Sequence, residues 1–360
     1  MSEKLRDLLE WVLCNPKLIL CILVGFIVHF VLSVLFPDVS GTQEGLDWES
    51  KPIPKNLRKS LAADWDSSKD ESWPVTGTLA LCSKIAYLDQ EEAKSNFRNL
   101  GFRQIEPISV DSMAGYVLTI GNVAVVVFRG TDDFDDWIVN INMTTTQTKH
   151  GAPHKGFQNA YLTIKPKVIS ALRRFKPKHV WVTGHSLGGA LAVLCAFDLA
   201  TNENWDIHGL MTFGQPMVGD KTLATSINQI LSPKFAHFVN ELDIVPRIPP
   251  GFYHCGNLVW FIDGKVRRSN QRPKMGTERP AESPPLTQEI LVPLTEIEFE
   301  QKKEIIRNRL VPKKPKDGAT VYEGNIPFIQ NHLIDSYLSK IQGISNLKDE
   351  IMEPQRKAEE

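Results

Sequence analysis

Short apolar runs alternate with segments of helical spacing over most of the chain. The runs GYVLTI (115–120) and VAVVVF (123–128) are separated by Gly121 and Asn122, which predicts a β-hairpin. Four further apolar runs predict strands: HVWVTG (179–184), IHGLMTFG (207–214), FAHFVN (235–240) and NLVWFID (257–263). Helical patterns connect most of them, at 156–175, 187–200 and 220–231. Alternating strands and helices predict an α/β fold whose mostly parallel sheet carries helices on both faces.

The strongest apolar run lies near the N-terminus. Leu18–Phe36 holds nineteen residues without a formal charge, and as a helix it would measure roughly 28 Å. It predicts an uncleaved transmembrane signal anchor, with a removed signal peptide as the alternative. Lys4, Arg6 and Lys17 precede the run, whereas only Lys51 follows within fifteen residues. The positive-inside rule then predicts a single-pass membrane protein with its globular part on the non-cytoplasmic side.

These patterns divide the chain into five parts. They are a cytoplasmic segment (1–17), the anchor (18–36), a polar linker (37–72), one globular domain (73–345) and a polar tail (346–360). Within the linker a short helix is expected near Leu57–Ala63. Within the domain we expect a polar, Pro-rich insertion at Arg267–Pro285 and then a charged amphipathic helix at Leu286–Leu310.

Composition excludes several classes of protein. Hydrophobic residues make up 42% of the 360 and charged residues 23%, so the chain can form a sizeable core. The net charge is -1 and no basic stripe is present, which argues against nucleic-acid binding. Cys82, Cys195 and Cys255 are too widely spaced for a disulfide framework or a zinc site, so we expect buried free thiols. Calcium-loop and P-loop patterns are absent, and no cofactor or metal is expected.

One serine lies in a sequence context that is typical of a catalytic nucleophile. GHSLGG (184–189) follows a predicted strand and opens a predicted helix, which is the context that a G-x-S-x-G motif requires. Gly184 and Gly188 allow the strand and helix to approach closely, and the turn exposes the hydroxyl of Ser186. The N-terminus of the following helix points at the same place, where negative charge would develop.

A serine nucleophile needs a histidine base and an orienting carboxylate, and in this kind of fold they follow in the order Ser, Asp, His. Asp243 follows the strand FAHFVN and is the favoured carboxylate. Asp220 is interpreted as a helix N-cap, while Asp198 lies within a helix and Asp263 ends a later strand.

Four histidines follow the serine. His208 and His237 lie in strands and are interpreted as structural. His332 comes after the last strand, so a late loop could carry it over the carboxyl edge of the sheet, and we favour it as the base. His254, eleven residues beyond Asp243, is the alternative.

Seven segments in their order resemble the class 3 lipase family, the fungal-lipase type of α/β hydrolase. They span about Val123 to Leu338 and read VVVFRGTDDFDDWIVNIN, HKGFQNAY, GHSLGGALA, FGQPMVGD, VNELDIVPRIPP, GFYHCG and IPFIQNHLIDSYL. The resemblance implies a catalytic triad of Ser186, Asp243 and His332. The predicted anchor and the insertion after Arg267 depart from the family pattern.

The resemblance also implies an oxyanion hole and a lid. The oxyanion hole would use the residue after FRG, Thr131, and the residue after the nucleophile, Leu187. Two backbone N–H groups aimed at one point stabilise a tetrahedral oxyanion, each by roughly 3 kcal/mol. The lid would be the helix at Asp133–Asn140, whose helically spaced Phe134, Trp137 and Ile138 could cover the serine and then meet lipid. An ordinary amphipathic surface helix is the alternative.

The expected function is therefore that of a membrane-anchored serine hydrolase. It would cleave carboxylic ester bonds of lipids, acylglycerols above all, through an acyl-enzyme on Ser186. The expected partners are a lipid ester substrate and, through the N-terminal helix, a membrane. The alternatives are a phospholipase A1 or small-ester esterase with the same triad, and a catalytically silent, membrane-tethered lipid-binding relative.

Overall fold

The structure is a computed structural model that describes residues 57–65, 67, 73–131, 133–268, 291–310 and 327–343. The predicted anchor Leu18–Phe36 and the predicted tail at 346–360 lie outside the described residues, as does most of the predicted linker.

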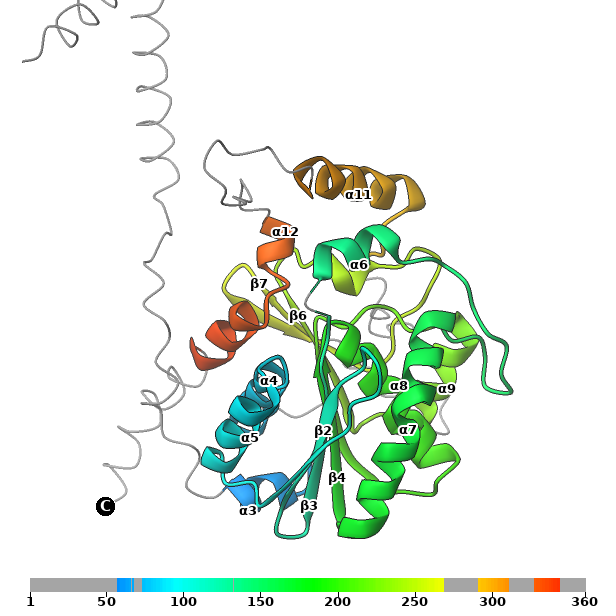
Figure 1. The fold of residues 1–360 in the computed structure, drawn as a ribbon. Coiled ribbons are helices and arrows are strands. Elements are labelled where there is room, and N and C mark those ends of the chain that lie inside the picture. The colour runs from blue at the N-terminus through cyan, green and yellow to red at the C-terminus, as the bar shows by residue number, and fades with distance from the viewer. Residues whose placement is uncertain are drawn as a thin grey trace, which may run out of the picture. The chain divides into compact units, whose positions relative to one another are not determined.

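A mixed sheet of eight strands forms the centre of the described part, and the strands lie in chain order across it (Figure 1). Neighbouring strands from β3 to β7 are parallel, while β1, β2 and β8 pair antiparallel at the two edges. The predicted hairpin is confirmed by the register Gly115↔Phe128 to Ile120↔Val123. The strands are β1 (Gln104–Pro107), β2 (Gly115–Ile120), β3 (Val123–Phe128), β4 (His179–His185), β5 (Ile207–Phe213), β6 (Phe235–Asn240), β7 (Asn257–Ile262) and β8 (Lys265–Arg268).

The two edge strands β1 and β8 were not expected from the sequence. Each has only four residues and no apolar run, because an edge strand is covered on fewer sides than a central one. The central strands β3, β5 and β6 are buried at every position and show as continuous apolar runs, as strands covered on both faces do.

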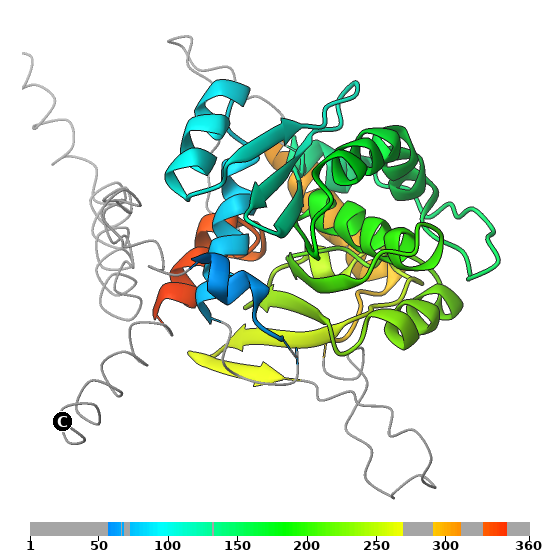
Figure 2. The same cartoon turned by 90° about the horizontal axis from the view of Figure 1, so that it is seen from below.

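Helices cover both faces of the sheet (Figures 1 and 2). One face carries α7 (Lys155–Phe175), α8 (Leu187–Thr201) and α9 (Lys221–Leu231). The other carries α3 (Leu57–Ala62), α4 (Trp73–Ile85), α5 (Gln90–Asn99) and a helix at residues 334–343. Helix α8 packs on β3, β4 and β5 and against α7 and α9, so it is buried on nearly every side. Its first residue follows Ser186, which fixes the serine to the most enclosed helix of the described fold.

The end of the predicted linker is part of the folded body. Leu61 of α3 is fully buried, and its carbonyl accepts a hydrogen bond of 2.7 Å from Nε1 of Trp181 in β4. The carbonyl of Ala63 accepts one of 2.8 Å from Nε2 of His208 in β5. The segment expected as a tether up to residue 72 therefore already packs on the sheet by Leu57.

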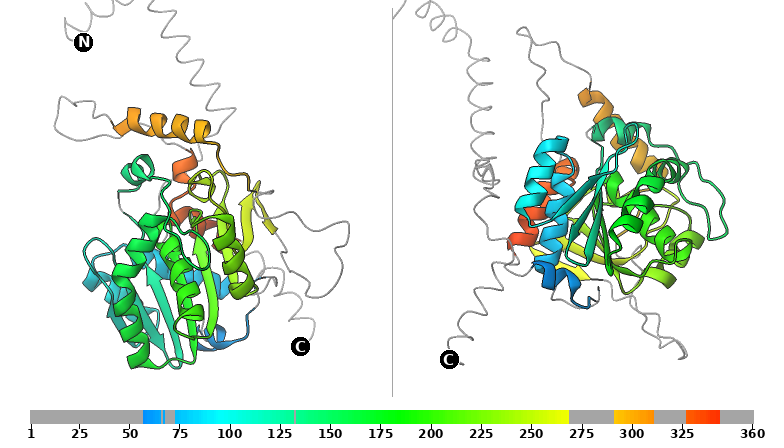
Figure 3. Two further views of the ribbon diagram at one scale, coloured as in Figure 1. Left: turned by 90° about the vertical axis from the view of Figure 1, so that its right-hand side faces the viewer. Right: turned by 60° about the horizontal axis from the view of Figure 1, so that its bottom comes forward.

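Three short elements and one long helix lie beyond the carboxyl edge of the sheet. They are α6 (Phe134–Asn140), a 3₁₀ turn η1 (Val245–Arg247), α11 (Glu296–Leu310) and α12 (Pro327–Gln330). Helix α11 packs against α6, as Figure 3 shows across the top of its left-hand view. The sequence predicted this helix from Leu286, but it begins at Glu296. A capping box explains that start, because Thr295 and Glu298 exchange hydrogen bonds of 2.9 and 3.2 Å.

The three cysteines of the described part are buried and free, which confirms that prediction. Burial raises the pKa of the Cys255 thiol to about 12 and also raises the pKa values of Cys82 and Cys195. They behave as small core residues rather than as reactive thiols.

Candidate active site

Ser186 occupies a strained turn between β4 and α8. Its φ is +58° and its ψ is −130°, a conformation that non-glycine residues adopt at a cost of about 1–3 kcal/mol. The two flanking glycines are sterically required. A Cβ on Gly184 would lie 2.3 Å from the carbonyl oxygen of Gly188, and a Cβ on Gly188 would lie 2.3 Å from that of Phe128. The turn thus places the serine at the carboxyl end of β4.

The two residues expected to form the oxyanion hole come from neighbouring strand ends. Leu187 is the first residue of α8, and Thr131 follows the end of β3, which is parallel to β4. The close approach of Gly188 to the carbonyl of Phe128 brings the first turn of α8 against the end of β3. The structure therefore brings the chain segments of Thr131 and Leu187 together at the edge where Ser186 lies.

Asp243 lies in the loop after β6 and is completely buried. Its Oδ1 accepts a hydrogen bond of 2.9 Å from the backbone N–H of Val245. The three other aspartates that were considered from the sequence have different contacts. Asp220 caps α9 through the N–H of Leu223, Asp198 pairs with Lys165, and Asp263 lies in the β7–β8 turn beside Arg267.

His332 contacts Asp243 directly. Its Nδ1 lies 3.0 and 2.9 Å from the two carboxylate oxygens of Asp243. Its carbonyl accepts a hydrogen bond of 2.6 Å from Nε2 of His185, the residue before Ser186. The rings of His332 and His185 are 4.5 Å apart. Histidine and carboxylate therefore meet at the end of the strand that carries the serine, whose buried Oγ has no hydrogen-bond partner among the described residues.

The three other histidines considered from the sequence lie elsewhere. His208 binds the carbonyl of Ala63 near the opposite end of the sheet. The buried rings of His237 and His254 lie 4.4 Å apart, and Nε2 of His254 donates to the carbonyl of Pro246. Burial lowers the pKa of His254 to about 4, so it stays neutral near neutral pH.

Three residues around the candidate site were not found from the sequence. Tyr337 donates a 2.5 Å hydrogen bond to Oδ2 of Asp243. Nδ1 of His185 accepts a 2.9 Å hydrogen bond from the hydroxyl of Tyr87, which follows α4. Burial, followed by the nearby charge of His332, holds the pKa of His185 well below its ordinary value. Tyr87 and Tyr337 are far from the serine in the chain, so no local spacing could reveal them.

The apolar side of helix α6 packs on the body of the protein and does not face solvent. The ring of Trp137 stacks on that of Phe157, with centroids 6.2 Å apart, and Ile138 is completely buried. Phe134 is the first residue of α6. Since α11 packs against α6, the expected lid lies beneath a second helix that the family resemblance did not include.

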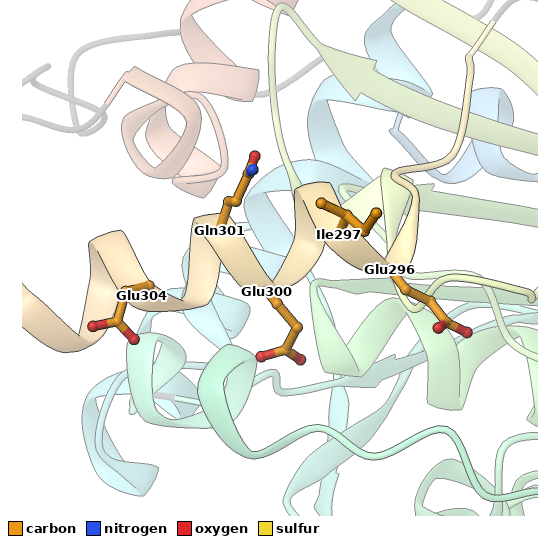
Figure 4. A pocket seen from close by; sticks show the side chains of 5 residues that line it. All are labelled: Glu296, Ile297, Glu300, Gln301 and Glu304. Atoms are coloured by element: carbon orange, nitrogen blue, oxygen red, sulfur yellow. The ribbon is translucent and has the colours of Figure 1, made fainter.

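A shallow pocket on α11 does not coincide with this site. It is lined by Glu296, Ile297, Glu300, Gln301 and Glu304, which Figure 4 shows on one stretch of the helix. Ser186, Asp243 and His332 do not line it, so the candidate chemistry lies elsewhere.

The sheet and the serine turn define an α/β-hydrolase-like protein. Residues 125–253 match the model of the Lipase (class 3) family, which confirms the resemblance predicted from the sequence. It is 35% identical over 151 residues to a lipase of Rhizomucor miehei, which covers 38% of this chain and 41% of the relative. It is 34% identical over 116 residues to a secreted mono- and diacylglycerol lipase of Malassezia globosa, covering 30% and 38%.

The matches to these curated relatives cover about two fifths of their length. Among solved structures, the chain is similar to the triacylglyceride lipase of Rhizomucor miehei, with 23% identity and a TM-score of 0.49. That similarity covers 62% of this chain and 91% of the lipase.

The comparisons contradict the predicted single-pass membrane location. The Malassezia relatives that the chain resembles are named as secreted lipases. Within the described ranges, no helix combines the length and the apolar character needed to cross a bilayer. The prediction rested on Leu18–Phe36, which lies outside those ranges, and an apolar run of that length does not by itself distinguish an anchor from other N-terminal segments.

Proposed function

We propose that this protein is a serine hydrolase that cleaves carboxylic ester bonds of lipids, with acylglycerols as the substrate class. The observation that carries the proposal is the contact of His332 with Asp243, made beside His185 at the end of the strand that delivers Ser186. The strained turn at Ser186 supports it as well, because strain of this kind is concentrated at functional sites. The proposed catalytic domain covers residues 73–345, and α3 (Leu57–Ala62) packs on its sheet.

In the proposed reaction, Oγ of Ser186 attacks the ester carbonyl carbon while Nε2 of His332 takes the hydroxyl proton. Asp243 orients the imidazole and stabilises its positive charge. The backbone N–H groups of Thr131 and Leu187 stabilise the oxyanion. The intermediate collapses, His332 protonates the departing alcohol, and Ser186 keeps the acyl group. Water, activated by His332, then releases the fatty acid and restores the serine.

The lipid character of the substrate is supported by the relatives and by the apolar surroundings. The relatives are named as lipases, two of them as acting on mono- and diacylglycerols. Leu187, Val245 and Ile138 belong to the same buried cluster as Phe299 of α11, so an acyl chain would meet hydrocarbon side chains on entering. We propose that Phe134, Trp137 and Ile138 cover the serine until α6 and α11 move.

Substitution of the nucleophile tests the proposal. Ser186→Ala should lower kcat by at least about 10⁴-fold on a hydrolysed ester, because the covalent route is lost. It should also abolish labelling by a fluorophosphonate probe while leaving the melting temperature nearly unchanged. Ser83→Ala is the matched control, since the Ser83 hydroxyl is also buried but donates to the carbonyl of Leu79. If Ser186→Ala keeps its activity, the proposed nucleophile is wrong.

A substrate panel separates the related activities. Mono-, di- and triacylglycerols, a phospholipid and a short water-soluble ester should be compared with the wild-type protein and with Ser186→Ala. Faster hydrolysis of acylglycerols supports the proposal, and preference for the phospholipid or the short ester would assign another substrate class to the same site. Failure of the wild type to hydrolyse any ester or to react with the probe would favour a silent lipid-binding protein.

A further inference from the structure

The carboxylate of Asp243 is completely buried, so its charge needs hydrogen-bond donors from the protein. Within the described residues, three donors reach it. The N–H of Val245 binds Oδ1 at 2.9 Å, the hydroxyl of Tyr337 binds Oδ2 at 2.5 Å, and Nδ1 of His332 lies within reach of both oxygens. Each oxygen thus has one donor of its own and shares the imidazole.

The direction of the Tyr337 hydrogen bond is fixed by its neighbours. The backbone N–H of Asn240 donates to the Tyr337 oxygen at 3.1 Å, so that oxygen is the acceptor in this contact. Its single proton is therefore available for Oδ2 of Asp243. Complete burial, followed by the negative charge of Asp243, raises the pKa of Tyr337 well above its ordinary value, so the hydroxyl remains a donor.

The same segment supplies both the histidine and this donor. Tyr337 lies in the helix at residues 334–343, five positions after His332. The side-chain amide of Asn240 also donates to the carbonyl of Asn331 at 3.0 Å. Both ends of the segment are thereby attached to the end of β6, where the loop of Asp243 begins. A rotation of the carboxylate away from His332 would break the hydrogen bonds from Tyr337 and Val245 together.

We propose that Tyr337 is a positioning residue that holds the Asp243 carboxylate with both oxygens toward His332 and shares its negative charge. The inference rests on the proposed function. It assigns a role to a residue that lies outside the matched family region 125–253 and to which the resemblance of the segment IPFIQNHLIDSYL gave no role. Tyr337 touches Asp243 and not Ser186 in any hydrogen bond of the described residues, so it acts through the carboxylate.

Other ionisable groups also lie near Asp243 and His332. His185 faces His332 from β4, and Tyr87 lies behind it, donating to Nδ1 of His185. His185 stays neutral because its pKa is well below the ordinary value. Two solvent-accessible ion pairs lie farther out, Lys84–Asp335 and Lys340–Glu241. Tyr337 is therefore the neutral donor whose removal most directly changes the orientation and the charge of the Asp243 carboxylate.

The test compares Tyr337→Phe with Tyr161→Phe in the full-length protein. Tyr161 is the matched control, because it is equally buried and donates a 2.6 Å hydrogen bond to Oδ2 of Asp198, away from the site. For each variant, kcat and KM on one hydrolysed ester are measured from pH 5 to 9, together with the melting temperature. Tyr337→Phe should lower kcat roughly tenfold with KM unchanged. The acid limb of its pH–activity profile should move to higher pH, because a carboxylate with one donor fewer attracts the imidazolium proton more strongly.

Tyr161→Phe should lower the melting temperature by a similar amount but leave kcat and the acid limb in place. If Tyr337→Phe shifts only the melting temperature, the positioning role is overturned while the proposed function stands. If the wild type neither hydrolyses esters nor reacts with the fluorophosphonate probe, the proposed function and this inference are overturned together.

Discussion

Single residues set the geometry of the serine turn, and glycine is required where the backbones meet. The Cβ that alanine would add at Gly188 lies 2.3 Å from the carbonyl oxygen of Phe128 and 2.9 Å from the carbonyl carbon of Arg129. Both neighbours are backbone atoms, one in the last residue of β3 and one in the residue after it, and they cannot turn aside as a side chain could. Separation of α8 from β3 would move Leu187 away from the end of the strand that leads to Thr131.

Substitution of this glycine tests the requirement. Gly188→Ala should lower the free energy of unfolding by about 1–3 kcal/mol or more, because overpacking forces the backbone to shift. Gly77→Ala in α4 is the control, since its Cβ would meet only Ile341, at 3.7 Å. That variant should be as stable as the wild type or gain about 0.5–1 kcal/mol from its helix position. Urea denaturation measures both values, and equal stability of the two variants would contradict the steric argument.

At the scale of elements, α11 and α6 form a two-layer cover above the carboxyl edge of the sheet (Figure 1). Phe299 and Ile306 of α11 are almost completely buried and lie in the same cluster as Ile138 of α6. The outer side of α11 carries Ile297, which is 74% exposed. The packing of one side of α11 therefore determines how firmly the cover is held.

Loosening this packing should expose the proposed nucleophile. Phe299→Ala should raise the rate of fluorophosphonate labelling at Ser186 by at least about tenfold, because Phe→Ala substitutions in cores cost about 3–5 kcal/mol. Ile297→Ala is the matched control on the exposed side of the same helix and should label at the wild-type rate. Mass spectrometry over time gives the rates. Equal rates for Phe299→Ala and the wild type would show that α11 does not limit access.

For the whole molecule, several buried histidines link stability to pH. Burial lowers the pKa values of His185, His237 and His254, that of His254 to about 4 from 6.5. Neither ring nitrogen of His237 has a hydrogen-bond partner among the described residues. Between pH 6.5 and about 4 the unfolded chain therefore binds more protons at these positions than the folded protein does.

The free energy of unfolding should accordingly fall as the pH is lowered through this window. Each such histidine contributes up to about 1.4 kcal/mol per pH unit to this decrease in the free energy of unfolding. His237→Leu should reduce the slope, because it removes one group that must be kept neutral in the fold. Chemical denaturation at several pH values between 7 and 4.5 measures the slopes of the wild type and the variant. The same slope in both would show that His237 does not contribute.

The sequence by itself determined the features that depend on neighbours in the chain. The hairpin at Gly121-Asn122, the central strands and the helices α7, α8 and α9 follow from local spacing, and so does the context of Ser186. Asp220 was correctly interpreted as an N-cap, because its partner Leu223 is only three residues away. The short edge strands β1 and β8 were not predicted, since four half-exposed residues show little alternation of apolar and polar positions.

Only the tertiary structure decided which distant residues meet. It brought Asp243 within hydrogen-bond distance of His332, 89 residues later, and placed Tyr337 and His185 against the same pair. It also packed α6 against α11, a contact that the sequence did not predict. The physical reason is that chain spacing fixes local turns and faces, whereas contacts across the carboxyl edge depend on how the sheet orders its strands and on where the late segments dock.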